Sequence, residues 1–359
     1  MPKYKTEDLP ELVKEIDRAG GDAHHPSLSH LHPFKLEYES VIDESLCPFS
    51  PEYYAQQIEL YEEISNRKLN QETNELHPQY NIPAHIDAPN PLGIVDINNS
   101  GGQVRGLATM ISVCGLCGLS NSPKILDLGA GHGLASELFA YLGCKVHSVD
   151  IDPDLGKLAR MRADYKKLNV HRHTQNFEDL SNLESDFDAA FFYQSLHHCL
   201  KPWEIIAEVK QKLNPQRPII AFTGEPVYTS WKHWGLRLEL DAIYVARKFG
   251  WFESGWSREF LEKCFLKSGM KLKLFTGGYA QSKIGVAMEE WDTRFTDEWD
   301  KLLTNYCKQI NVQLVPPKNH FSQSLQKMGY RFARYYLYEY LPRPLKQALR
   351  KLYRRFLKY

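Results

Sequence analysis

The sequence predicts an α/β fold built on a mostly parallel β-sheet with helices on both faces. Two observations support this prediction. From residue 123 onward, short apolar segments alternate with segments of helical periodicity, and repeated β-α units of this length are typical of a parallel sheet. The first apolar segment, 124–128, runs into a glycine-rich turn that is followed by a helical pattern, as expected where a backbone turns sharply beside a ligand.

The expected elements follow one another in a regular order. Strands are expected at 124–128, 145–149, 170–175, 189–193, 218–223, 271–275 and 284–288. Helices are expected at 9–18, 51–68, 106–119, 134–142, 154–168, 203–213 and 257–267. The helix at 51–68 follows a Ser-Pro start, and the helix at 257–267 begins at Ser257, a residue that suits the N-cap position. The sheet is therefore expected to have seven strands.

This order divides the chain into three regions. The first 122 residues form an N-terminal extension, residues 123–289 the α/β domain, and residues 290–359 a C-terminal region that is expected to be helical. Residues 225–256 interrupt the β-α pattern and are rich in aromatic side chains, which fits either a lid over a substrate or the core of a helical cap. As a lid, this insertion would contact the substrate through Tyr228, Trp231, His233 and Trp234.

The N-terminal extension also contains a polar stretch. Residues 70–99 are punctuated by prolines and are expected to form mostly loop. The densest polar run, 70–77, is expected to be solvated, with contact to a substrate as the alternative.

Composition and charge exclude several classes of protein. The 359 residues have a formal net charge of zero, so no overall field attracts nucleic acid, and no nucleic-acid partner is expected. Seven scattered cysteines are expected to be reduced thiols. The N-terminus lacks the apolar segment of a signal peptide, and the longest uncharged apolar stretch, 107–119, is too short to span a bilayer. A cytoplasmic protein is expected.

The C-terminal end differs from the rest of the chain in charge. From residue 327 to the end there are ten Lys or Arg residues and one acid, Glu339. Within 342–359 the apolar residues fall on one face of a helix and the basic residues on the others, a pattern typical of a helix that lies on an anionic membrane. A peripheral position on the inner face of the membrane is expected, with docking onto a partner or onto the acidic body as alternatives.

The glycine-rich turn carries the most specific signal. Its glycines are Gly129, Gly131 and Gly133, and Leu134 occupies the position of the third glycine of a dinucleotide fingerprint. Asp127 lies two residues before the first glycine. An acid there suits a ligand that carries an ammonium group.

Together with the segments that follow, this turn resembles motif I of class I S-adenosylmethionine-dependent methyltransferases, a family with a Rossmann-like sheet. The resemblance covers about residues 123–288. It implies S-adenosylmethionine (SAM) as cofactor, with Asp127 near its ammonium, Asp150 on the ribose hydroxyls and Ile151 against the adenine. Asn176 stands where the family usually has Asp. The implied cofactor contacts are Asp127, Gly129, Ala130, Gly131, Gly133, Asp150, Ile151, Asn176, Phe177 and Tyr193.

The turn after the fourth strand lies beside the reactive methyl group in this family. It contains His197 and His198, and histidine is suited to accept a proton near neutral pH. Either histidine is a candidate base, and a structural role for both is the alternative. Glu225, after the fifth strand, could bind a sugar hydroxyl, ligate a divalent metal or anchor a loop. No ligand pattern requires a metal, because Cys114 and Cys117 lack a second pair.

These features predict O-methylation of a sugar or glycan hydroxyl in surface polysaccharide biosynthesis, based on Glu225, the aromatic insertion and the basic tail. A small-molecule or natural-product methyltransferase is the alternative. A SAM-binding scaffold without catalysis is the third hypothesis.

Overall fold

The computed structural model describes residues 3–93, 103–104, 106–108, 110–111, 119, 122–277, 283–289, 308 and 312–314. The basic segment 342–359 and the pair Cys114 and Cys117 lie outside the described residues. No helix in the described ranges has the length and apolar character needed to cross a membrane.

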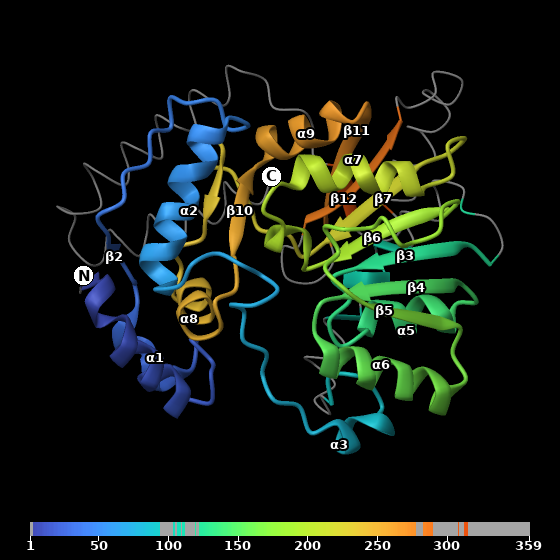
Figure 1. The fold of residues 1–359 in the computed structure, drawn as a ribbon, viewed down its shortest axis with the longest axis horizontal. Helices are drawn as coiled ribbons and strands as arrows, with labels where there is room; N and C mark the ends of the chain where they lie inside the picture. Colours follow the sequence, from blue (N-terminus) through green and yellow to red (C-terminus); the bar gives the residue numbers. More distant parts are fainter. Residues whose placement is uncertain are drawn as a thin grey trace. The chain divides into compact units, whose positions relative to one another are not determined.

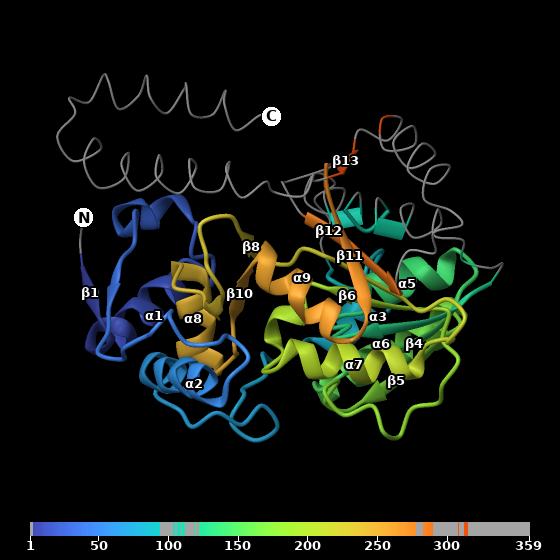
Figure 2. The ribbon, with the colours of Figure 1, turned by 90° about the horizontal axis from the view of Figure 1, so that it is seen from above.

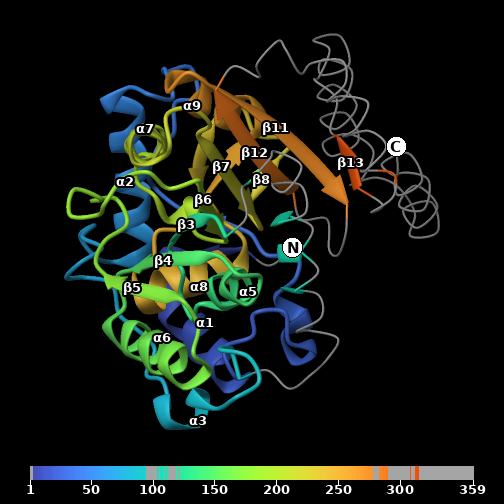
Figure 3. The same ribbon diagram turned by 90° about the vertical axis from the view of Figure 1, so that its right-hand side faces the viewer.

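The central feature is an eight-stranded sheet with the order β13-β11-β12-β7-β6-β3-β4-β5 (Figures 1 and 3). The strands are β3 Lys124–Leu128, β4 Lys145–Asp150, β5 Val170–Thr174, β6 Ala189–Tyr193, β7 Ile219–Thr223, β11 Met270–Gly277, β12 Lys283–Glu289 and β13 Val312–Leu314. The five strands from β7 to β5 pair in parallel, and β12, β11 and β13 pair antiparallel. The mostly parallel seven-stranded sheet is confirmed, and β13 is an edge strand that the periodicity did not predict.

Helices cover both faces of this sheet (Figures 2 and 3). They are α5 Leu134–Tyr141, α6 Pro153–Lys166, α7 Pro202–Lys212 and α9 Arg258–Lys267. Ser257 caps α9 as predicted, since its side chain accepts a hydrogen bond from the Phe260 N–H at 3.1 Å. Within the predicted helix at 106–119, residues 106–108 and 110–111 are helical, as are 103–104 just before it, and residue 119 is not helical.

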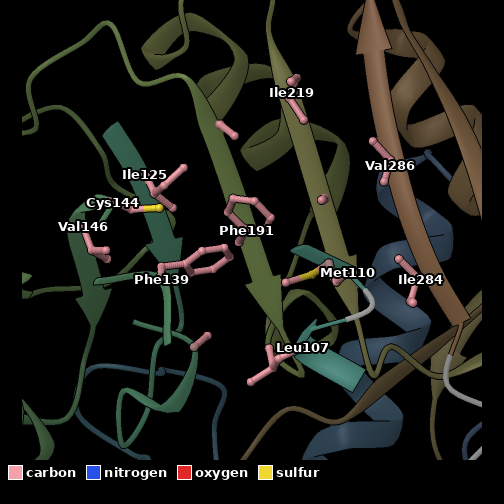
Figure 4. Close-up of a cluster of buried hydrophobic side chains, with 13 residues drawn as sticks. Leu107, Met110, Ile125, Phe139, Cys144, Val146, Phe191, Ile219, Ile284 and Val286 are labelled. Atoms are coloured by element: carbon pink, nitrogen blue, oxygen red, sulfur yellow. The ribbon is translucent and has the colours of Figure 1, made fainter. Parts of the chain in front are cut away.

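One face of the sheet packs against the segment around residue 107 and against α5. Leu107, Met110 and Phe139 lie against strand residues such as Phe191 in a buried cluster (Figure 4). The opposite face packs against α9, where the rings of Phe222 and Phe265 stack with centroids 6.0 Å apart. Side chains alternate between the faces along a strand, so strands buried on both sides read as continuous apolar runs.

The N-terminal extension and the insertion together build a cap. The extension contributes β1 Tyr4–Lys5, α1 Leu9–Arg18, β2 Leu36–Glu37 and α2 Pro51–Ser65, with 3₁₀ turns at Thr6–Asp8 and Pro26–Leu31. Its last helix, α3 Ile82–Ile86, packs against α6 of the α/β domain instead. The insertion contributes β8 Val227–Tyr228, β9 Trp234–Leu236, α8 Leu240–Phe249 and β10 Ser254–Ser257. α8 packs against both α1 and α2, so two segments distant in sequence share one core. α2 ends earlier than the predicted residue 68, because Asn66 is left-handed with φ 56°.

Half of the aromatic residues of the insertion are buried in the core of this cap. Trp234, Phe252 and Trp256 are at most 3% exposed. Two tyrosines of α2 fasten the insertion: the Tyr53 hydroxyl donates to the Trp234 carbonyl at 2.6 Å, and the Tyr61 hydroxyl donates to the Gly250 carbonyl at 2.5 Å. For these buried rings the core interpretation of the insertion therefore applies rather than the lid interpretation.

The Tyr61→Phe variant tests this attachment. The change leaves a buried carbonyl without its donor, so the free energy of unfolding should fall by about 2 kcal/mol, as measured by urea denaturation. Tyr54→Phe is the matched control on the same helix, because no hydrogen bond of its hydroxyl is found among the described residues. Equal stability of the two variants would contradict the proposed attachment.

Candidate active site

A cavity of about 640 Å³ opens at the carboxyl ends of β3, β4 and β6. Ligands of open parallel sheets bind at this edge, and the volume lies in the range of small-molecule sites. Its walls come from the glycine turn, the end of β4, the turn after β5, the turn after β6 and two segments of the cap. Residues that line it include Gln71, Glu75, His77, Tyr80, Gly129, Ala130, Gly131, Asp150, Ile151, Asn176, Phe177, Tyr193, His197, His198, Arg237, Trp251 and Glu253.

The glycine turn passes close to the neighbouring β6 turn. Gly129 has a φ of +64°, and a Cβ there would lie 2.4 Å from the Cβ of Ser195, so only glycine fits. Gly131 also has a positive φ, +51°, but a Cβ there would meet no atom within 4 Å. The space beside Gly131 therefore belongs to the cavity. Gly133 does not line the cavity and instead precedes the first residue of α5.

Asp150 is held at the cavity wall by backbone hydrogen bonds. Its Oδ2 accepts from the Gly131 N–H at 2.7 Å and its Oδ1 from the Asp152 N–H at 3.0 Å. Arg172, whose side chain is fully buried, lies 3.6 Å from Asp150 Oδ1 and donates to the Gly131 carbonyl at 2.9 Å. Asp152 caps α6, because its Oδ1 accepts from the N–H groups of Asp154 and Leu155. Sequence reasoning missed Arg172, because a single arginine in a strand carries no local signal.

Asp127 is a correction to the sequence prediction. Its side chain is fully buried, does not line the cavity and accepts a hydrogen bond from the Ser136 hydroxyl of α5. Burial raises the pKa of Asp127 to about 6. Side chains on a strand alternate in direction, and in this register Asp127 points toward the helix that packs on the sheet. It ties β3 to α5 instead of meeting a ligand ammonium.

The other predicted cofactor residues meet at one end of the cavity. Ile151 follows β4, and Asn176 and Phe177 form the turn after β5. The Asn176 side chain accepts from the Glu178 N–H at 2.9 Å, which fixes this turn. Tyr193 ends β6 on the same wall. Eight of the ten predicted positions line the cavity; Asp127 and Gly133 do not.

Glu225 organises the turn after β6 instead of facing a ligand. Its side chain is fully buried and does not line the cavity. Oε1 accepts from the N–H groups of Ser195 and Leu196, both at 3.0 Å, and Oε2 accepts from the N–H of His197 at 3.0 Å. Of the three interpretations that the sequence left open, the geometry corresponds to the loop anchor.

His197 lies between two carboxylates. Its Nδ1 is 2.9 Å from Glu225 Oε2, and its Nε2 is 3.5 Å from Glu253 Oε2. Burial disfavours the charge on His197, but Glu225 and Glu253 outweigh it and raise the pKa of the imidazole. His197 is therefore an internal cation, which makes it a poor proton acceptor.

His198 has the opposite character. Burial and the charge of the adjacent His197 lower the pKa of His198, so the ring is neutral at physiological pH. Its Nδ1 lies 3.1 Å from the Phe252 carbonyl, and a carbonyl can only accept, so the proton belongs on Nδ1 and the lone pair on Nε2. The side chain is 28% exposed and lines the cavity.

Metal-type ligand atoms also gather here. Ligand atoms of His197, His198 and Glu253 lie within 4.8 Å of one another. However, Glu253 Oε2 is also 3.1 Å from Arg237 Nη1. These side chains form a network of hydrogen bonds and ion pairs, in which Arg237 is shared by Glu253 and Asp241.

The N-terminal extension supplies part of the cavity wall. The Gln71 side chain donates to the His198 carbonyl at 2.8 Å, and His77 Nδ1 lies 3.4 Å from Asp152 Oδ2. Tyr80 packs edge-on against His132, with ring centroids 5.0 Å apart. Residues 70–77 form a partly exposed loop, as expected, but Gln71, Glu75 and His77 line the cavity. Their polar pattern resembles that of any exposed loop, so only tertiary contacts reveal their position.

The candidate substrate residues of the insertion lie elsewhere. Trp234 is 3% exposed and donates to the Pro48 carbonyl, and His233 Nε2 lies 3.1 Å from the Glu44 carbonyl. Tyr228 and Trp231 stack on each other with centroids 4.6 Å apart. None of the four lines the cavity. The aromatic residue of the insertion that does is Trp251, whose ring centroid is 6.2 Å from that of His198.

Comparison with known proteins identifies this part of the chain. The family model of the methyltransferase domain matches residues 125–216, which include β3 to β6 and α7. Residues 125–216 are a methyltransferase domain. Over these residues, the predicted resemblance to methyltransferases is confirmed.

Curated relatives of the methyltransferase domain include ubiquinone biosynthesis O-methyltransferases. That of Xanthomonas campestris pv. campestris is 36% identical over 93 residues, and that of Xanthomonas euvesicatoria pv. vesicatoria is 34% identical. The match with the first covers 26% of this chain and 39% of the relative. The chain thus matches about two fifths of the length of these relatives.

Solved structures with similar chains are also methyltransferases. A SAM-dependent methyltransferase from Aquifex aeolicus is 14% identical with a TM-score of 0.41, and the alignment covers 53% of this chain and 92% of that one. One from Clostridium acetobutylicum is 14% identical with a TM-score of 0.42, and the alignment covers 58% and 98%.

Glu225→Gln tests the anchoring role. The amide NH₂ would face backbone N–H donors, so this substitution should lower the free energy of unfolding by about 3 kcal/mol, as measured by urea denaturation. Glu239→Gln, at an exposed carboxylate of the same insertion, is the control and should change stability by less than about 0.5 kcal/mol. An unchanged stability of the Glu225 variant would contradict the anchor.

Proposed function

We propose that this chain is a SAM-dependent O-methyltransferase whose acceptor is a sugar hydroxyl. The observation that carries the proposal is that one cavity joins the predicted cofactor residues around Asp150 to a neutral histidine, His198. The first group can bind a nucleoside and the second can accept a proton. The functional unit we propose is the α/β domain, residues 123–289, closed by residues 71–80 of the extension.

The residues at the glycine turn fit the cofactor. The free space beside Gly131 allows a ligand to lie against the main chain. Asp150 would accept hydrogen bonds from the ribose hydroxyls, and Ile151 and Phe177 would flank the adenine, with Asn176 and Tyr193 completing the wall. When bound, SAM supplies an electrophilic methyl group on a sulfonium.

The chain itself orients the acceptor and removes its proton. His198 would accept the hydroxyl proton at Nε2, because Nδ1 is committed to the Phe252 carbonyl. Glu225 holds the backbone of the turn that carries His198, and the hydrogen bond from Gln71 fixes the His198 carbonyl. General base catalysis of this kind contributes about 100- to 10,000-fold to a rate.

Two observations support the choice of acceptor. The curated relatives are named as O-methyltransferases, which favours oxygen. Trp251 places an indole beside His198 in the cavity, and flat apolar rings pack well against sugars. A phenolic hydroxyl is the second candidate, favoured by the ubiquinone biosynthesis relatives.

The basic segment 342–359 is the reason to propose association with an anionic membrane surface. Its support is the amphipathic sequence pattern alone. An acceptor assembled at a membrane, such as a growing surface glycan, is consistent with that position.

Asp150→Asn tests the cofactor assignment. It replaces one charged acceptor by an amide, so the affinity for SAM should fall by about 10- to 100-fold, as measured by isothermal titration calorimetry. Asp154→Asn, at an exposed carboxylate of the same region, should bind normally. A melting curve shows whether the variant is folded, and a folded Asp150 variant with unchanged affinity would refute the assignment.

His198→Gln tests the proton acceptor, with transfer of a labelled methyl group from SAM to sugar nucleotides, glycan extracts and quinols as the assay. The rate should fall about 100-fold while the affinity for SAM stays within about twofold. Because the pKa of His198 is lowered, the wild-type rate should rise with pH below 6.5 and be flat from pH 7 to 8. Only above its pKa is the ring a free base.

Two controls accompany this assay. His171→Gln, at an exposed histidine of β5, should keep the wild-type rate. Dialysis against EDTA should also leave the rate unchanged, since Arg237 already neutralises Glu253. Full activity of the His198 variant would refute the role of His198 as base. If only the quinols are labelled, the acceptor is a phenolic hydroxyl and not a sugar hydroxyl.

A further inference from the structure

Glu75 is a cavity-lining carboxyl group for which the described residues provide no cation. It reaches the cavity from the extension, and its hydrogen-bond partner is the neutral side chain of Gln71. No ion pair to Glu75 occurs within the described ranges. A carboxyl group removed from water without a counter-ion is costly, so its position calls for a positively charged ligand.

The charged groups that face Glu75 increase this cost. They are Asp150 from the end of β4, Glu253 from the residue before β10 and Glu178 from the turn after β5, all of them acids. Burial first, and these three carboxylates next, raise the pKa of Glu75 to about 8. The free protein therefore carries Glu75 mostly in its neutral form at pH 7.

The basic side chains that line the cavity already face other carboxylates. Arg237 pairs with Glu253 at 3.1 Å and with Asp241 at 2.7 Å. His77 Nδ1 lies 3.4 Å from Asp152 Oδ2. Arg237 cannot neutralise Glu75 without releasing another carboxylate, so we assign the missing charge to the ligand.

The neighbours of Glu75 also define its place along the cavity. Asp150 marks the ribose end of the proposed cofactor site, and Glu253 contacts the histidines at the acceptor end. The charges of both carboxylates act on Glu75, so Glu75 lines the cavity within reach of both groups. The sulfonium of SAM is bonded to the ribose carbon nearest the acceptor, so it occupies the interval between these ends.

We propose that Glu75 is the counter-ion of the cofactor sulfonium and makes the cavity prefer SAM over S-adenosylhomocysteine, the product that has lost this charge. The inference rests on the proposed function and adds the residue that distinguishes the cofactor from its demethylated product. When the cation binds, Glu75 releases a proton to solvent and becomes a carboxylate. After methyl transfer the thioether is neutral, the carboxylate is again unpaired, and Glu75 takes up a proton as the product leaves.

Calorimetry in buffers of different ionisation enthalpy counts the released protons directly. At pH 7 the wild-type protein should release about 0.9 proton more per SAM than per S-adenosylhomocysteine, the neutral fraction of an acid with a pKa of about 8. Sinefungin, which carries an amine in place of the sulfonium, should behave like SAM. In Glu75→Gln this difference should vanish, which also corrects for titration of the ligands' own amino groups.

The affinities provide a second readout. Glu75→Gln should weaken SAM about tenfold and change S-adenosylhomocysteine by less than twofold. The preference of the wild-type protein for SAM should increase as the pH rises through 8, because more Glu75 is ionised, and should be flat in the variant. Glu72→Gln, at an exposed neighbour in the same segment, is the matched control and should match the wild-type protein.

Each result has one interpretation. Equal proton release for SAM and S-adenosylhomocysteine in the wild-type protein would overturn the proposal, as would a variant that weakens both ligands equally. Equal release would instead assign Glu75 to the α-ammonium group that both ligands carry. If the folded wild-type protein binds neither nucleoside, the proposed function fails instead, and the Glu75 proposal fails with it.

Discussion

The arrangement of the site depends on one buried carboxylate. Glu225, at the end of β7, accepts hydrogen bonds from three successive N–H groups of the turn after β6 and contacts the ring of His197. Backbone donors at the start of such a turn have no partners within it, so the carboxylate both satisfies them and fixes the turn. His198 follows directly, and its place at the cavity is thereby set by a side chain that does not itself reach the cavity.

The same carboxylate separates the chemistry of the two histidines. His197 shares the charge of Glu225 and Glu253 and becomes a cation, and that cation helps keep His198 neutral. Adjacent titratable groups with pKa values pushed in opposite directions are a frequent property of acid-base sites. The pKa of His197 is raised because its ring lies between the two carboxylates, and the pKa of His198 is lowered. This difference identifies His198 as the candidate base.

The cap gives the site its second half. Segments 71–80 and 251–253 come from opposite parts of the sequence and meet over the cavity, because α2 and α8 share an apolar core and the Trp251 indole donates to the Leu76 carbonyl. The cap brings Glu75 and Glu253 to a cavity that already contains Asp150, and the result is an acidic cavity. An acidic cavity whose cations are committed elsewhere favours a cationic ligand, which is consistent with SAM on grounds independent of the glycine motif.

The sequence by itself determined the α/β domain, the seven strands to within a few residues, and the positions of Gly129, Asp150 and Asn176 at the cavity. These follow from local patterns, because buried strands, capped helices and glycine turns are set by neighbouring residues. The tertiary structure alone decided that Asp127 faces a helix, that Glu225 is an anchor, that Trp234 is core and that Glu75 lines the cavity. Each of those outcomes depends on a contact with a residue about ten to two hundred positions away in the sequence. A short-range sequence pattern does not indicate which distant residue a side chain will contact.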